Sequence, residues 1–142
     1  MWNAMTEGVK IELERWIGPH GERVKLSEST PQSLRVGLAK LDGRKTDSCW
    51  ITIEEAGILM VGGGPAGYVV YSFRLDGSMS HVEAETGEKG TIEIRVGGIT
   101  RRFPCAMKLS YNMVCGIAER FLLSRAFDCS LNWVDDCGED PE

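Results

Sequence analysis

Apolar and polar residues alternate along much of the chain, and this alternation predicts β-strands. Residues 10–16 alternate apolar and charged side chains, the pattern of a half-buried strand. Similar runs predict further strands at residues 50–53, 58–61, 68–74, 91–96, 99–103 and 131–134. Gly97-Gly98 is a two-residue hairpin signal, and Asp76-Gly77 marks another turn. We therefore expect a meander of antiparallel strands, with a loop between residues 17 and 29.

Two segments instead carry apolar residues at helical spacing. The first begins at Thr30, a capping residue followed by Pro31, and is expected to end at residues 42–43. The second begins at Ser110 and has an apolar stripe formed by Met113, Val114, Ile117, Ala118, Phe121 and Leu122. The order of elements predicts an α+β fold, an antiparallel β-sheet meander with two packed helices, in one domain of residues 1–142.

Composition narrows the classes of function. The net charge of −5 disfavours direct binding to nucleic acid and permits a basic partner. Five scattered cysteines and two distant histidines lack metal-ligand spacing and fit a reducing compartment. No secretory signal or membrane-spanning run is visible, so we expect a cytoplasmic protein. The acidic tail, residues 135–142, is expected to be mobile.

The glycine-rich segment at residues 62–67 allows two interpretations. Gly62, Gly64 and Gly67 satisfy the spacing of a dinucleotide-binding fingerprint, which would indicate a small flavin or nicotinamide oxidoreductase. That site needs a helix directly after the glycines, because the pyrophosphate binds the N–H groups of the first helical turn. Residues 68–73 are aromatic and β-branched, which is typical of a strand. The favoured interpretation is a bend between two strands.

Other candidate chemistry is sparse. The acid pairs Glu54/Glu55 and Glu83/Glu85 are typical of a solvated surface, and His81 is expected in an exposed loop or strand. Trp50 and Trp133 lie in apolar strands and are assigned to the core. We expect no catalytic residue, no cofactor and no metal.

Residues 48–134, about 60% of the chain, resemble a known family in the order and spacing of their elements. A strand at residues 50–53 precedes the glycine-proline bend, and an aromatic strand runs through Phe73. The hairpin ends in Phe103-Pro104, a helix opens at Ser110, and residues 131–133 close the domain. This arrangement resembles the first family of immunity proteins of bacterial polymorphic toxin systems. That family's helix usually ends in Thr-Gly, where this chain has Ser124-Arg125.

The resemblance implies a protein that is not an enzyme but binds and neutralises a cognate toxin. The toxin is often a nucleic-acid deaminase, which would supply its own zinc. Such an enzyme has a basic substrate cleft, and an acidic surface can block access to it. We expect one aromatic anchor and several acids to bind the toxin: Tyr68, Asp76, Glu83, Glu85, Asp135 and Asp136.

Overall fold

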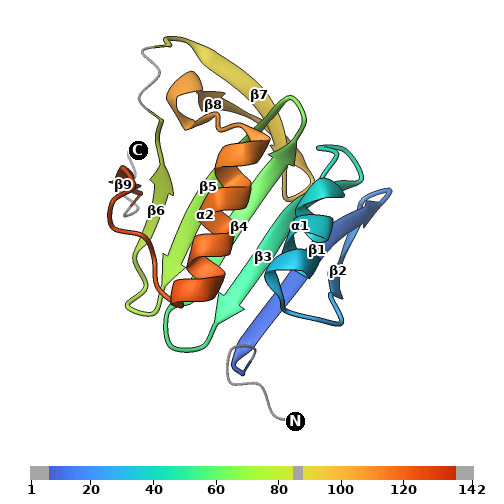
Figure 1. Ribbon diagram of the computed structural model, residues 1–142. Coiled ribbons are helices and arrows are strands. Elements are labelled where there is room, and N and C mark those ends of the chain that lie inside the picture. The colour runs from blue at the N-terminus through green and yellow to red at the C-terminus, as the bar shows by residue number, and fades with distance from the viewer. Residues whose placement is uncertain (1–6, 85–87, 137–142) are drawn as a thin grey trace.

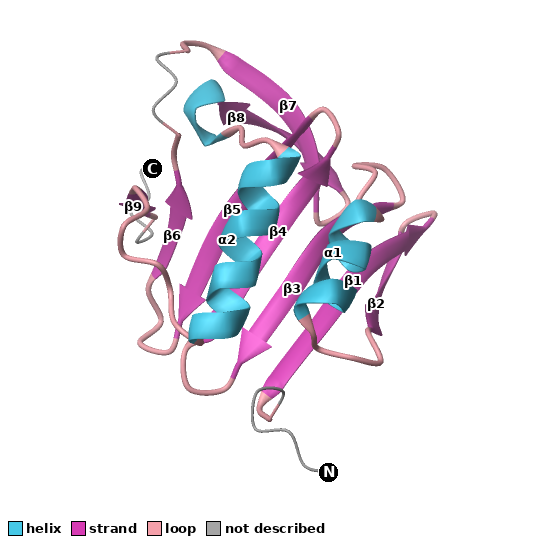
Figure 2. Cartoon of the chain, viewed as in Figure 1, coloured by secondary structure: helices cyan, strands magenta, loops and turns pink. Residues whose placement is uncertain are grey.

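The computed structural model describes residues 7–84 and 88–136, and it has the α+β fold that the sequence predicts (Figures 1 and 2). The described residues form two α-helices, α1 (Pro31–Ala39) and α2 (Tyr111–Ser124), and a short 3-10 helix at Cys105–Met107. The strands are β1 (Val9–Ile17), β2 (His20–Lys25), β3 (Thr46–Ile53), β4 (Gly57–Gly64), β5 (Gly67–Arg74), β6 (Met79–Val82), β7 (Thr91–Val96), β8 (Ile99–Pro104) and β9 (Trp133–Asp135).

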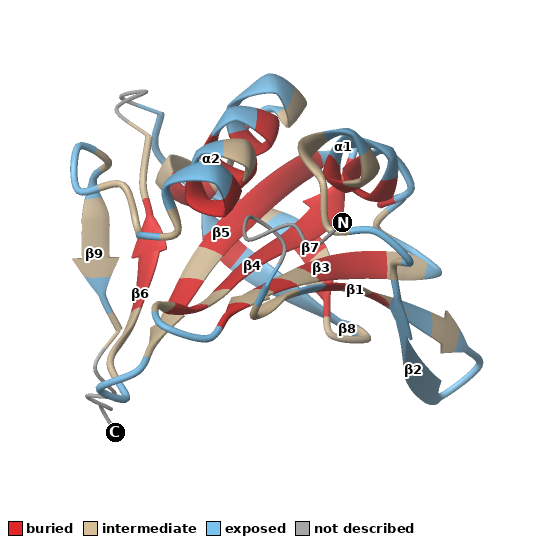
Figure 3. Cartoon of the chain, turned by 60° about the horizontal axis from the view of Figure 1, so that its bottom comes forward, coloured by how far each residue is buried: buried red, intermediate tan, exposed pale blue. Residues whose placement is uncertain are grey.

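The chain forms three layers. Seven strands make one antiparallel sheet in the order β2-β1-β3-β4-β5-β6-β9, and β7 and β8 form a separate hairpin. Both helices cover one face of the sheet, and the main core lies between them and β1, β3, β4 and β5 (Figure 3). The hairpin packs on the opposite face, where a second, smaller core includes Met60, Val69, Ile94 and Phe103. We call this second face the outer face.

Local capping explains where the helices begin and end. Thr30 caps α1 through a reciprocal pair of hydrogen bonds with Ser33, and Ser110 accepts from the backbone N–H of Met113 at the start of α2. Arg125 ends α2 in the left-handed conformation, with φ of 57°, a position that usually favours glycine. Its guanidinium is ion-paired with Glu55, which links the end of α2 to the β3–β4 turn.

The glycine-rich segment is a strand and a turn. β4 runs to Gly64, residues 65–66 turn, and β5 begins at Gly67, so no helix follows the glycines. A Cβ on Gly62 would lie 2.7 Å from a methyl group of Val96 in the hairpin. A Cβ on Gly64 would lie 2.5 Å from the backbone of Asp42 and Gly43 in the α1–β3 loop. The glycines therefore let three parts of the chain meet at van der Waals distance.

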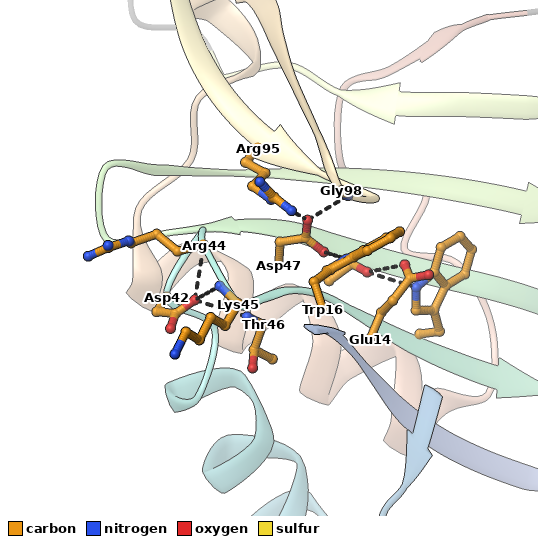
Figure 4. A network of polar contacts seen from close by, with 11 residues as sticks. Glu14, Trp16, Asp42, Arg44, Lys45, Thr46, Asp47, Arg95 and Gly98 are labelled. Carbon is orange, nitrogen blue, oxygen red and sulfur yellow. Dashed lines mark hydrogen bonds and ion pairs between the residues drawn. The ribbon is translucent and has the colours of Figure 1, made fainter. Parts of the chain in front are cut away.

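Asp47, a fully buried residue of β3, holds the hairpin on the outer face (Figure 4). One carboxylate oxygen accepts a 2.7 Å hydrogen bond from the backbone N–H of Gly98, at the hairpin turn, and the other accepts from the indole N–H of Trp16. Arg95 of β7 forms a 3.5 Å ion pair with the same carboxylate. A buried carboxylate is stable only with such partners, so this contact fixes the position of the hairpin.

Asp42 stabilises the adjacent loop, also shown in Figure 4. Its carboxylate accepts hydrogen bonds from the backbone N–H groups of Arg44, Lys45 and Thr46. Burial acts to raise the pKa of this carboxyl, but the three N–H donors outweigh it and hold the pKa below its usual value. The loop against which Gly64 packs is thereby kept in one conformation.

Several local predictions were wrong. Residues 20–25 were expected in a loop but form β2, an edge strand with all six residues exposed. The first helix ends at Ala39, before the expected residues 42–43, although Leu41 is still buried. Met113, expected in the apolar stripe of the second helix, is 43% exposed. The strand at Met79–Val82 was not predicted, because four residues carry too little periodicity to detect.

We predict that Gly64→Ala lowers the free energy of unfolding by about 1–3 kcal/mol, because the new methyl group would overlap backbone atoms. Gly116→Ala is the matched control: it adds the same methyl group in α2 with no atom within 4 Å. It is expected to raise the free energy of unfolding by up to about 1 kcal/mol. Urea denaturation of both variants measures the difference, and equal effects would contradict the packing role of Gly64.

We predict that Asp47→Asn lowers the free energy of unfolding by about 1–3 kcal/mol. The amide has one oxygen acceptor, so either the Gly98 N–H or the Trp16 N–H would face the amide NH₂ group. Thermal unfolding, together with fluorescence of the partly buried Trp16 indole, measures the loss. A variant as stable as the parent chain would show that the hairpin is held by apolar contacts alone.

Candidate protein-binding site

The hairpin covers only part of the outer face. Cross-strand pairing makes direct neighbours of four residues: Trp50 of β3, Met60 of β4, Tyr71 of β5 and His81 of β6. Phe73 lies two residues further along β5, where it pairs with Ile58 and Met79. Met60 is buried against the hairpin, whereas the three aromatic side chains are only partly buried. The sheet therefore presents an aromatic surface beside the hairpin.

These rings form a continuous stack, which we call the aromatic row: Trp50, Phe73 and Tyr71. The Trp50 and Phe73 ring centroids lie 5.8 Å apart at 21°, and those of Phe73 and Tyr71 lie 6.4 Å apart at 23°. Nearly parallel rings at these separations attract one another beyond the effect of burial. The His81 ring meets the edge of Tyr71 at 5.9 Å and ends the stack.

Polar contacts fix Trp50 at the other end of the aromatic row. Its indole N–H donates to the hydroxyl of Ser48 over 2.9 Å, and that hydroxyl donates to Glu14 over 3.0 Å. The guanidinium of Arg23, on edge strand β2, lies 4.0 Å above the ring centroid, a cation–π contact. An aromatic side chain held this firmly loses little conformational entropy when it binds a partner.

Two carboxylates border the Tyr71 end. His81 is only 7% exposed, and its two ring nitrogens lie 2.7 Å from Asp136 Oδ2 and 2.9 Å from Glu83 Oε2. A neutral ring can donate to one carboxylate, and the imidazolium can donate to both. The side chain of Glu83 is 30% exposed, and that of Asp136 is 28% exposed. We call Glu83 and Asp136 the acidic rim.

The phenol of Tyr71 stays protonated beside this rim. Burial raises the pKa of Tyr71, the negative charge of Asp136 raises it further, and Arg101 of β8 acts in the opposite direction. The hydroxyl is therefore a neutral hydrogen-bonding group at neutral pH.

The structure brings together two of the six residues predicted to bind a toxin, Glu83 and Asp136. Asp135 directly precedes Asp136 in the chain, but it pairs with Ser80, on the opposite face of the sheet from His81. Asp76 lies in the β5–β6 turn, where its carboxylate accepts from Ser78 N–H. The hydrogen bonds from Ser78 lower the pKa of Asp76. Glu85 and most of the acidic tail lie outside the described residues.

Tyr68 does not have the surface position that an anchor requires. It is 5% exposed in the main core, with its ring 6.0 Å from that of Tyr111 and its backbone bridged to Leu109. Burial raises the pKa of Tyr68, and a charge on Cys115 would raise it further. Residues alternate between faces along β5, so Tyr71 and Phe73 lie on the outer face, opposite Tyr68.

The aromatic row was not predicted from the sequence, and the burial of His81 was not expected. The histidine was expected to be exposed, and it is buried between two carboxylates. Trp50 was assigned to the core, and it is only partly buried on the outer face. The alternation of aromatic residues along residues 68–74 was the available signal, since Tyr71 and Phe73 must share one face.

Within residues 7–84 and 88–136, no three His, Cys, Asp or Glu side chains are grouped as metal ligands. No helix of this described part is long and apolar enough to cross a lipid bilayer. Comparisons with protein-family models, with curated proteins and with solved structures found no match for the chain.

Proposed function

We propose that the chain is an immunity protein that binds a cognate bacterial toxin, a nucleic-acid deaminase, and neutralises it by blocking substrate access. The observation that carries this proposal is the aromatic row, which is ordered yet partly exposed on the outer face. Tryptophan and tyrosine are enriched among the residues that dominate binding energy at protein interfaces. The choice of toxin class follows the family resemblance of residues 48–134.

The acidic rim supports the same proposal. A deaminase that acts on nucleic acid attracts phosphates with lysine and arginine side chains around its cleft. Glu83 and Asp136 present negative charge around His81, whose ring contacts that of Tyr71. Complementary charge speeds the encounter of two proteins and orients them, while the aromatic side chains supply affinity.

Co-expression tests the function directly. Bacteria that express the toxin encoded beside this chain's gene are expected to survive when the chain is also expressed, and the purified proteins are expected to form a stoichiometric complex. Cells that die equally with and without this chain would contradict the proposal.

We predict that Phe73→Ala weakens toxin binding by about 30-fold or more, the effect of removing an interface residue worth about 2 kcal/mol. Leu123→Ala is the matched control, since Leu123 is an apolar residue of α2 that is 52% exposed on the helical side. Isothermal titration calorimetry measures both affinities. Equal affinities for the two variants would exclude the outer face as the binding surface.

A further inference from the structure

We infer that the toxin places an arginine against Tyr71, with its guanidinium at the exposed edges of the Glu83 and Asp136 carboxylates that flank His81; this inference rests on the proposed function. The partner group would be one of the arginines that bind substrate phosphates in the deaminase. The chain would then block the cleft by occupying a phosphate-binding side chain.

The aromatic row already accepts one guanidinium from the chain itself. Arg23 lies 4.0 Å over the Trp50 ring and also forms a 3.7 Å ion pair with Glu12. Together these contacts combine an aromatic face with a carboxylate at its side. The Trp50 end of the aromatic row is therefore filled by an internal cation.

The Tyr71 end has the same two components. The Tyr71 ring contacts His81, which binds the carboxylates of Glu83 and Asp136, and the charge of Asp136 acts on the Tyr71 phenol. Among the described residues, the cation–π contacts of the outer face involve Trp50 and Trp16, and none involves Tyr71. Arg101 is the nearby cation that acts on Tyr71, and it is exposed on β8. The two ends differ in that the chain supplies a stacked cation at only one of them.

The charge of the acidic rim favours a cation in either state of His81. With a neutral imidazole the three side chains carry a charge of −2, and with an imidazolium they carry −1. His81 contacts one oxygen of each carboxylate, Oδ2 of Asp136 and Oε2 of Glu83. Among the described residues, the second carboxylate oxygen of Glu83 and that of Asp136 have no hydrogen-bond partner, and both side chains are partly exposed.

Arginine fits this position better than lysine. A guanidinium is planar, so it can stack on the Tyr71 ring and donate sideways to two carboxylates at once. An ammonium group has no such flat face. The arginine side chains that enzymes use for phosphates have the required chemistry, since a carboxylate resembles a phosphate as a bidentate acceptor.

The test compares two charge-matched double variants by their affinity for the toxin domain encoded beside this chain's gene. Glu83→Gln/Asp136→Asn removes the acidic rim, and Glu93→Gln/Asp135→Asn removes two exposed acids that do not contact His81. The first is expected to weaken binding about tenfold or more and to reduce its salt dependence. The second is expected to change affinity less than about twofold.

A double-mutant cycle identifies the partner residue. Each arginine of the toxin cleft is replaced by glutamine, and one replacement is expected to lose most of its effect in the Glu83→Gln/Asp136→Asn background. Equal affinity losses in the two double variants, or no coupled arginine, would overturn the inference while leaving neutralisation intact. Failure of the parent chain to bind would instead contradict the proposed function. Thermal unfolding checks each variant, and Glu83→Gln alone replaces the double variant if that one does not fold.

Discussion

The close approach of three parts of the chain at the glycines of β4 is the constraint on which the rest of the structure depends. Gly62 leaves space for Val96 of the hairpin, and Gly64 leaves space for the backbone of the α1–β3 loop. Larger side chains at either position would separate these parts. Asp47 then fixes the hairpin by accepting from Gly98 at its turn. The glycines thus serve packing, where their spacing alone suggested a phosphate-binding turn.

This constraint also determines which part of the outer face stays open. The hairpin is held over Gly62 and Val69 and buries Met60, so the paired positions further along β3 and β5 remain partly exposed. Those positions carry the aromatic row. Aromatic side chains that stay partly exposed together on one face are typical of a protein-binding surface, which supports the proposal that this face binds the partner.

The sequence predicted the fold class and most strands, because alternation and turn residues are local properties. Thr30 and Ser110 begin the helices as expected, and Gly97-Gly98 turns the hairpin. Arg125 ends the second helix where a glycine is usual, and this residue adopts the left-handed conformation itself. β2 was missed because its residues are all exposed and show no alternation in burial.

The site was less predictable because it depends on pairing between distant strands. Glu83 and Asp136 were both expected to bind a partner, but nothing local indicates that they meet at His81. That meeting requires the register of β5 with β6 and of β6 with β9, two strands of four and three residues. Tyr68 was expected to be an anchor and is buried, because the face of β5 that lies against the core depends on which side the helices cover.

The most direct test of the central claim is side-chain footprinting by hydroxyl radicals, with and without the toxin bound. Mass spectrometry measures oxidation at each ring, and the account predicts that Trp50, Tyr71 and Phe73 become protected in the complex. Met113 and Leu123, exposed on α2, are expected to react equally in both states. Protection of Met113 and Leu123 with no change at the aromatic row would contradict the claim that the outer face binds the partner.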